Sequence, residues 1–359
     1  MIFPDYLKNG DVIGVTAPSR GVDEPADKER FLRGAEKLSE KGFKVQFTAN
    51  VFAGNDRYGR SSSAEVKASQ LKELIEDKSV KAIYSASGGD FLAEILPLVD
   101  TDAFKSNPKW IQGYSDNTSL LYYLTTKCDI ATVYGFNFSD FGMDPWQESV
   151  ERGFKVLTGE AKEQTSFEFF QNGFGSRETG KEGYSEDEPV CWKNVYAGEE
   201  QNSCPCEKEV FYDNNTEILM EGRLIGGCMD VLLNISGTPY DGTLDFIEKY
   251  KEDGIIWYLE SFDLHFEQMM EGLWKMKEMG WFKYAKGFIF GRPLFYPTEA
   301  YDGSPLPSYE EILTERLKPL GLPVISDADI GHKGPQFVMI NGAKARIESA
   351  GGKGRILYI

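Results

Sequence analysis

Residues 109–127 read KWIQGYSDNTSLLYYLTTK, and this stretch is typical of a single strand, turn and helix. Residues 109–113 form a short run that predicts a strand. The run passes through a turn directly into residues 119–127, which predict a helix. A strand that leads straight into a helix is the repeating unit of a parallel sheet covered by helices.

The residues before this stretch repeat the same alternation. Strands are predicted over residues 11–17, 43–47 and 80–85, and helices over residues 28–41, 62–76 and 91–98. The fold class is therefore α/β, and we expect an N-terminal domain with a parallel sheet over residues 1–165.

The second half of the chain has its own strands and helix. Strands are predicted over residues 254–259 and 287–291, and a helix is predicted over residues 264–279. Residues 336–340 and 343–347 flank Asn341-Gly342, a dipeptide that favours a two-residue hairpin turn. We therefore expect these two runs to pair with each other.

The pattern breaks down between about residues 165 and 215. This part is rich in Gly, Glu, Asn and Ser, and it carries scattered aromatic residues that include Phe174, Trp192 and Tyr196. Its length exceeds that of ordinary loops, which predicts a functional segment or one with short strands. We expect an interdomain connection or lid over residues 166–220, followed by a second domain over residues 221–359.

The charge of the chain disfavours two classes of partner. The 359 residues include 57 acidic and 39 basic side chains, which give a net charge of −18. Such a charge repels phosphate backbones and anionic membrane surfaces, so we expect no nucleic-acid or membrane partner. The first residues lack a signal-peptide pattern and no apolar run approaches the roughly 20 residues of a membrane span, so we expect a cytoplasmic protein.

Cysteine and histidine residues are few. Five cysteines suggest no disulfide framework, and Cys204 and Cys206 lie in a polar stretch without a nearby histidine. Their spacing is a weak match to a zinc site, and their role stays open. The chain has only two histidines, His265 and His332, so we expect no metal site and few general bases.

Ser115 is the candidate nucleophile. It lies between Gly113 and Asn117, at the turn where the predicted strand becomes a helix. Such a turn exposes a serine hydroxyl, and the backbone N–H groups at the helix start face a developing oxyanion. The alternative from the residues alone is that Ser115 or Asp116 simply caps an ordinary helix.

A serine nucleophile needs a base, and the base needs a group that orients it. His332 lies in a glycine-rich loop after a predicted strand, where the site residues of α/β folds gather. Glu260 ends a strongly apolar strand, and orienting an imidazole would give that carboxylate a partner. The alternatives are a surface-loop histidine and a glutamate that caps the next helix, while His265 beside an apolar helix stripe is expected to be structural.

Gly88 and Gly89 follow the strand predicted over residues 80–85. Glycines at the end of a strand let a backbone N–H group approach a substrate closely. The alternative is a plain turn between a strand and a helix, because the pair is a weak signal by itself.

Taken together, these strings resemble the LD-carboxypeptidase family of serine peptidases, which includes the microcin C immunity proteins. The resemblance rests on GYSDNTSL at 113–120, WYLES at 257–261 and IGH at 330–332. Supporting strings are DVIGVTAPS at 11–19, SGG at 87–89, GRLIGG at 222–227 and GFIFGRP at 287–293. Any one string is weak, but their order and spacing along the chain are specific.

The resemblance implies a parallel-sheet α/β domain followed by a smaller, β-rich α/β domain, with the active site at their interface. It assigns Ser115 as nucleophile, Glu260 as orienting carboxylate and His332 as base. It places the oxyanion hole at the backbone of Gly88, Gly89 and Asp116. It implies no metal or organic cofactor, and it implies a homodimer.

One departure from the family bears on the substrate. Many muropeptide-cleaving members carry an arginine before the Gly-Gly pair, where this chain has Ser87. An arginine can bind a substrate carboxylate with two hydrogen bonds, and a serine cannot. We therefore expect Ser87, Trp192 and Tyr196 to contact substrate, with the two aromatic rings stacking on a nucleobase. The alternative is that these rings pack the domain junction.

Three functions remain at this point. The first is a serine hydrolase that cleaves an amide bond in a small peptide-like substrate, as a microcin-immunity-like amidase of peptidyl- or aminoacyl-nucleotides. The second is an LD-carboxypeptidase that removes terminal D-alanine from muropeptide tetrapeptides. The third belongs to another class, a non-catalytic protein that binds a small ligand between two α/β domains.

Overall fold

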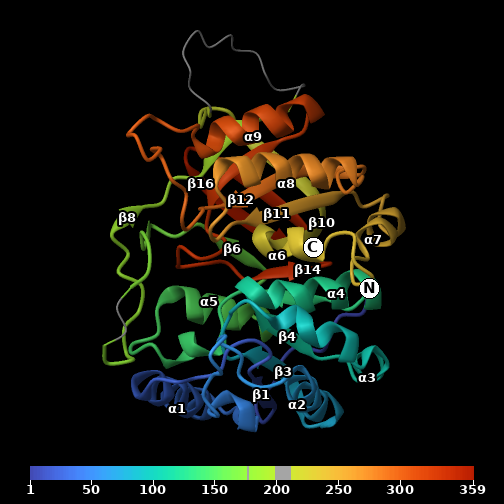
Figure 1. Cartoon of the computed structure of the whole chain (residues 1–359), viewed down its shortest axis with the longest axis vertical. Coiled ribbons are helices and arrows are strands. Elements are labelled where there is room, and N and C mark those ends of the chain that lie inside the picture. The colour runs from blue at the N-terminus through green and yellow to red at the C-terminus, as the bar shows by residue number, and fades with distance from the viewer. Residues whose placement is uncertain (176–177, 199–211) are drawn as a thin grey trace.

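The computed structural model describes residues 1–175, 178–198 and 212–359. Two sheets dominate it, with the N-terminal one in the blue to green half of Figure 1 and the other in the yellow to red half. Helices flank both sheets. The mixed α/β class predicted from the sequence is confirmed, including the parallel N-terminal sheet.

The first sheet has six strands in the order β14-β5-β4-β3-β1-β2. All neighbours are parallel except β14 and β5. Its strands are β1 (Val12–Thr16), β2 (Lys44–Phe47), β3 (Val80–Ser85), β4 (Trp110–Gly113), β5 (Thr132–Tyr134) and β14 (Met339–Asn341). Its helices are α1 (Pro25–Glu40), α2 (Ala64–Glu76), α3 (Thr101–Ser106), α4 (Thr118–Cys128) and α5 (Glu148–Leu157).

The second sheet has eight strands in the order β6-β16-β15-β10-β11-β12-β13-β9, parallel from β10 to β13 and antiparallel elsewhere. Its strands are β6 (Glu163–Thr165), β9 (Lys193–Tyr196), β10 (Ile218–Cys228), β11 (Ile255–Glu260), β12 (Ala285–Gly291), β13 (Val324–Ala328), β15 (Lys344–Ala350) and β16 (Lys353–Tyr358). Its helices are α6 (Met229–Ile235), α7 (Thr243–Lys249), α8 (Phe266–Glu278) and α9 (Tyr309–Leu317).

Shorter elements complete the described chain. β7 (Phe169–Phe170) and β8 (Glu188–Pro189) pair as a small ribbon in the middle stretch. The 3-10 helices are η1 (Ala49–Val51), η2 (Leu92–Leu98), η3 (Ser115–Asn117), η4 (Phe138–Gly142) and η5 (Lys318–Leu320). The segment expected to be a short helix over residues 91–98 is therefore the 3-10 helix η2.

The predicted hairpin around Asn341-Gly342 is wrong. β14 pairs with β5 of the first sheet, while β15 pairs with β10 and β16 of the second. The turn is present, but the chain crosses there from one sheet to the other, and Figure 1 shows β14, in red, at the junction of the two halves. A dipeptide determines local backbone geometry, whereas the partner of a strand depends on distant residues.

The sheets do not divide the chain at residues 165 and 220. β6 belongs to the second sheet although it precedes residue 166, and β9 brings part of the middle stretch to the far edge of the same sheet. A cluster of buried apolar side chains runs from Leu71 in α2 to Ile356 in β16, so the two halves share a core. This shared packing holds the strand ends of both sheets in fixed positions around one cavity.

None of the helices in the described ranges is both long enough and apolar enough to cross a bilayer.

Candidate active site

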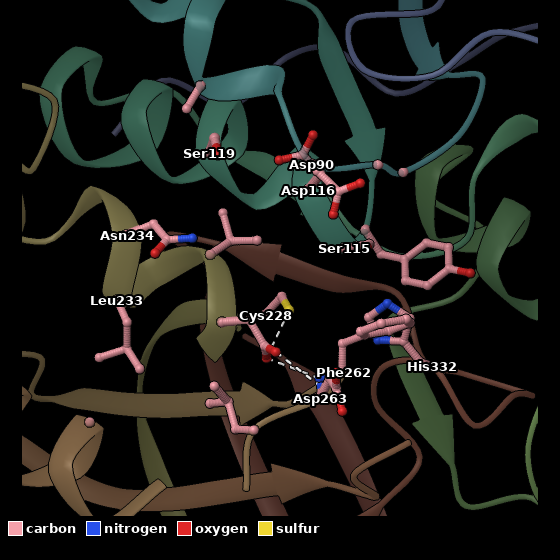
Figure 2. Close-up of a pocket in the computed structure, with 18 of the residues that line it drawn as sticks. Asp90, Ser115, Asp116, Ser119, Cys228, Leu233, Asn234, Phe262, Asp263 and His332 are labelled. Atoms are coloured by element: carbon pink, nitrogen blue, oxygen red, sulfur yellow. Dashed lines mark hydrogen bonds between the residues drawn. The ribbon is translucent and has the colours of Figure 1, made fainter. Parts of the chain in front are cut away.

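Ser115 lies on the turn between β4 and α4, as predicted from residues 109–127. Its φ of 64° is in the left-handed region, which non-glycine residues seldom adopt. Backbone strain of this kind persists only where the surrounding structure imposes it, and it gathers at functional sites. The turn directs the Ser115 side chain into a cavity between the two sheets (Figure 2).

The Gly88-Gly89 turn after β3 lies directly against this serine. A Cβ atom on Gly88 would come within 3.0 Å of the Ser115 Cβ and 3.1 Å of its Oγ. Only glycine allows the two segments to approach so closely. Ser87, Gly88 and Gly89 line the same cavity as Ser115.

His332 and Glu260 form a buried pair across the cavity from Ser115. The His332 Nδ1 lies 2.8 Å from the Glu260 Oε2, and the two side chains are 4% and 0% exposed. Glu260 is the last residue of β11, and the loop after β13 carries His332. Gly331 permits this contact, because a Cβ there would come within 2.5 Å of the Glu260 Oε2.

The other ring nitrogen of His332 has no hydrogen-bond partner among the described residues. An acceptor at Glu260 places the ring proton on Nδ1 and leaves Nε2 with a free lone pair. Ser115 and His332 line the same cavity, although they make no hydrogen bond with each other in the described structure. Catalytic hydrogen bonds are often long before substrate binds, so the predicted contact between them stays a prediction.

Tyr134 joins the nucleophile to the carboxylate, a role that was not predicted from the sequence. Its hydroxyl accepts a hydrogen bond from the Ser115 N–H at 3.2 Å and donates one to the Glu260 Oε1. Burial raises the pKa of Tyr134 well above its usual value, and the Glu260 charge adds to this effect. The hydroxyl therefore stays protonated and remains a donor. The available signal was its position at the end of β5, next to β4.

The Asp116 side chain connects the nucleophile turn by hydrogen bonds to two neighbouring segments of the chain. Its buried Oδ2 accepts hydrogen bonds from the Ser19 hydroxyl and, at 2.8 Å, from the Leu92 N–H. Burial raises the pKa of this carboxyl, while the Ser19 and Leu92 hydrogen bonds lower it in part. The carboxylate therefore joins the nucleophile turn to Ser19 and to Leu92, which lies three residues after Gly89.

The cavity has a volume of about 1490 Å³, above the roughly 300–1,000 Å³ of many ligand sites. It extends from Ser115 and His332 toward Leu233 and Asn234 on α6 (Figure 2). Acidic and basic residues along it, besides His332, are Arg20, Asp90, Asp116, Asp230, Asp263, Glu271, Lys275 and Arg316. Within the described ranges, no group of three or more His, Cys, Asp or Glu side chains is arranged to hold a metal ion.

Models of one protein family match both halves of the chain. The LD-carboxypeptidase N-terminal domain matches residues 13–135, and the LD-carboxypeptidase C-terminal domain matches residues 221–347. The chain belongs to the LD-carboxypeptidase family. It is therefore an enzyme of the LD-carboxypeptidase type, a serine peptidase or amidase.

Among curated proteins, the chain is similar to the microcin C7 self-immunity protein MccF of Escherichia coli. The two are 29% identical over 357 residues, which cover 95% of this chain and 92% of the relative. A solved MccF-like protein from Bacillus anthracis matches with a TM-score of 0.79 at 25% identity, over 100% of both chains. MccF in complex with aspartyl sulfamoyl adenosine matches at 0.75 and 25%, over 100% of this chain and 99% of that one.

Trp192 and Tyr196 do not reach the cavity of this LD-carboxypeptidase family member. Trp192 is fully buried against Phe337, and Tyr196 lies on β9 at the far edge of the second sheet. Neither lines the cavity, so the structure gives no support to substrate contact by either ring. The prediction that these two rings contact substrate was wrong. An aromatic ring is chemically suited to stacking on a nucleobase, but the pairing of its strand decides which surface the ring faces.

Among the described residues of the middle stretch, Phe174 is the aromatic residue that lines the cavity. Its ring is 67% exposed and packs against Phe262 and Phe295. Phe262 in turn lies 4.9 Å, centroid to centroid, from the His332 ring. The middle stretch therefore contributes to the site through a residue that the sequence analysis noted and did not select. Cys204 and Cys206 lie outside the described residues.

Trp192 has a structural role behind His332. Its Nε1 donates a hydrogen bond of 3.0 Å to Asp329 Oδ2, and Arg292 donates one of 2.5 Å to Oδ1 of the same carboxylate. Asp329 is 0% exposed and stands three residues before His332, in the loop that the Phe337 N–H closes on the Asp329 carbonyl. The buried indole therefore helps to hold the loop that carries the histidine.

Replacing Trp192 with phenylalanine should destabilise the protein. The change removes the indole N–H from a buried carboxylate, and such a loss costs about 1–3 kcal/mol of the free energy of unfolding. Urea denaturation measures this effect. Trp274→Phe is the control, because Trp274 is 54% exposed. Equal free energies of unfolding for the two variants would contradict the structural role of Trp192.

Proposed function

We propose that Ser115, His332 and Glu260 form the catalytic triad of a serine amidase. The observation that carries this proposal is the strained Ser115 turn facing a buried His332–Glu260 pair across one cavity. Nucleophile, base and orienting carboxylate come from the ends of different strands, where side chains of an α/β fold converge. Their order in the chain is the order that the family resemblance implies.

The proposed reaction follows acyl-enzyme chemistry. His332 Nε2 takes the proton of the Ser115 hydroxyl as Oγ attacks the substrate carbonyl, and the carbonyl π electrons move onto its oxygen. The N–H groups of Gly89 and Asp116 stabilise this oxyanion. When the tetrahedral intermediate collapses, the C–N bond breaks and His332 protonates the leaving amine. Water, deprotonated by His332, then releases the acyl group and restores Ser115.

Glu260 keeps His332 in the tautomer that this reaction needs. Its Oε2 accepts a hydrogen bond from the Nδ1–H group, so the lone pair of Nε2 is directed away from Glu260. The carboxylate also stabilises the imidazolium that forms when His332 takes the serine proton. Tyr134 occupies the other oxygen of Glu260 and so limits rotation of the carboxylate.

For the substrate we propose an aminoacyl- or peptidyl-nucleotide amide. The similarity to MccF supports this choice, because a solved structure of that protein contains aspartyl sulfamoyl adenosine. The large cavity volume supports a substrate with more than a short peptide. The exposed ring of Phe174 offers a surface on which a nucleobase can stack, an interaction worth roughly 1–3 kcal/mol per base.

An LD-carboxypeptidase that removes terminal D-alanine is the second candidate. The observation that favours it is the match of both halves of the chain to LD-carboxypeptidase domains. Ser87 lines the cavity where an arginine is common in muropeptide-cleaving members, and it offers no charge to a terminal carboxylate. The two candidates therefore differ in what the cavity must recognise beside the scissile amide: a nucleotide in the first case and a terminal carboxylate in the second.

A side-by-side assay separates the two substrates. The purified protein is incubated with an LD-linked muropeptide tetrapeptide and with aspartyl sulfamoyl adenosine, and the products are measured by mass spectrometry. We expect cleavage of the nucleotide analogue to be faster. Release of D-alanine with the nucleotide analogue untouched would overturn the proposed substrate.

Phe174→Leu should lower kcat/KM for the nucleotide analogue roughly tenfold, because it removes the stacking surface and keeps an apolar side chain. The control is Phe169→Leu, from the same stretch, because Phe169 does not line the cavity. An equal kcat/KM for the two variants would refute nucleobase stacking on Phe174.

We propose in addition that the protein acts as a cytoplasmic homodimer. The support for a dimer is the family resemblance. Light scattering coupled to gel filtration tests the oligomeric state, and cell fractionation tests the compartment.

A further inference from the structure

Arg20 is a cation that lines the cavity and has no partner within the described residues. Its side chain makes no hydrogen bond and no ion pair with any residue that the structure describes, and it is exposed to the cavity. Lys275, which lines the same cavity, instead donates a hydrogen bond of 3.0 Å to the Leu233 carbonyl. In a chain with 57 acidic side chains, an arginine left unpaired in a catalytic cavity is available to bind an anion.

The backbone holds Arg20 beside the nucleophile. Its N–H donates a hydrogen bond of 3.2 Å to the Gly88 carbonyl, and the preceding residue, Ser19, donates its hydroxyl hydrogen bond to Asp116. A Cβ atom on Gly89 would come within 2.8 Å of the Arg20 Cγ. The Arg20 stem therefore packs on Gly89, while Ser115 packs on Gly88 of the same turn.

We propose that Arg20 binds a carboxylate that the substrate carries next to the scissile amide. This inference rests on the proposed function and names the group that the site recognises. A guanidinium presents two parallel N–H donors that match the two oxygens of a carboxylate. Because Arg20 and Ser115 contact adjacent residues of one turn, a carboxylate held by Arg20 lies close to the carbonyl that Ser115 attacks.

Asp90 restricts where such a carboxylate can bind. It lines the cavity at the nucleophile end, near Asp116 and Ser115 (Figure 2). Two like charges in close contact disfavour each other, so an anion beside Asp90 alone would be repelled. Binding of a carboxylate at this end of the cavity therefore depends on the charge of Arg20.

Two kinds of substrate can supply the carboxylate. One is the C-terminal carboxylate of a peptide, which leaves with the last residue. The other is the side-chain carboxylate of an acidic aminoacyl group joined to a nucleotide. Both present the same group to Arg20, and a pair of ligands that differ only by acid or amide tests each source.

The experiment measures binding by calorimetry in Ser115→Ala, so that no turnover occurs. The ligands are aspartyl sulfamoyl adenosine with its asparaginyl counterpart, and the muropeptide tetrapeptide with its C-terminal amide. The acid ligands are aspartyl sulfamoyl adenosine and the tetrapeptide with its free C-terminal carboxylate. Introducing Arg20→Gln into the Ser115→Ala protein should weaken binding of one of them by about 10- to 100-fold, the range of a charged hydrogen-bonded pair. Binding of the matching amide should change less than about threefold.

The ligand whose binding Arg20→Gln weakens identifies the source of the carboxylate. Loss confined to the aspartyl ligand assigns the aminoacyl side chain, and loss confined to the tetrapeptide assigns the peptide terminus. Arg57→Gln is the control, because it removes the same charge from an exposed residue that does not line the cavity. An equal loss for acid and amide ligands, an equal loss in Arg57→Gln, or no loss for either acid ligand would overturn the proposal.

This test is separate from that of the triad. Should Ser115→Ala retain turnover, the assignment of the nucleophile fails. The acid-to-amide comparison then uses kcat/KM in place of affinity, and a fall confined to an acid ligand in Arg20→Gln still indicates that Arg20 binds a carboxylate.

Discussion

Replacing Ser115 with alanine is expected to lower turnover by about 10⁴- to 10⁶-fold, the range found when a serine nucleophile is removed. The substitution deletes only the Oγ atom, which makes no hydrogen bond to a described residue. The backbone hydrogen bond from the Ser115 N–H to Tyr134 is retained. The melting temperature should therefore stay close to that of the wild type, which separates loss of chemistry from loss of folding.

A fluorophosphonate probe tests whether Ser115 is the nucleophile, and this test requires no knowledge of the substrate. The wild type should gain one covalent adduct, located at Ser115 by peptide mass spectrometry, because His332 activates this hydroxyl. Ser119→Ala is the matched control: Ser119 lines the same cavity from α4, and its removal should leave labelling intact. A wild-type protein that stays unlabelled, or turnover by Ser115→Ala at the wild-type rate, would refute the assignment of Ser115 as the nucleophile.

Glu260→Gln is expected to lower kcat by up to about 10⁴-fold, as when the carboxylate of a serine triad becomes an amide. Glu260 now accepts hydrogen bonds on both oxygens, from His332 and from Tyr134. An amide has only one acceptor oxygen. Its NH₂ group therefore faces either Tyr134 or His332, and in the second case it favours the tautomer with the proton on Nε2, which cannot accept the serine proton.

The control for this prediction is Tyr134→Phe, which removes the hydrogen bond to Oε1 and leaves the Glu260 charge in place. We expect a smaller fall in kcat, because the His332–Glu260 contact remains. Steady-state kinetics of both variants, with circular dichroism to check folding, makes the comparison. Activity of Glu260→Gln within a factor of two of the wild type would show that Glu260 only caps the following loop.

Much of the fold could be predicted because its elements depend on neighbouring residues. β1, β3 and β4 are short apolar runs, and α2 and α4 have local helical patterns, so each lies close to its predicted place. The candidate triad followed from the same local information. Ser115, Glu260 and His332 each stand at or just beyond the end of a strand, where chain reversal exposes a side chain.

The amino-acid sequence thus determined the α/β class, the strand–turn–helix around Ser115 and the family to which the chain belongs. The tertiary structure alone decided the partners: β14 joins the first sheet, Trp192 is buried behind His332, and Phe174 lines the cavity in its place. It also decided that Tyr134 bridges Ser115 and Glu260. The physical reason is that local backbone preferences act over a few residues. Pairing, burial and the assembly of a cavity depend on residues that are distant in the chain and meet only when the core packs.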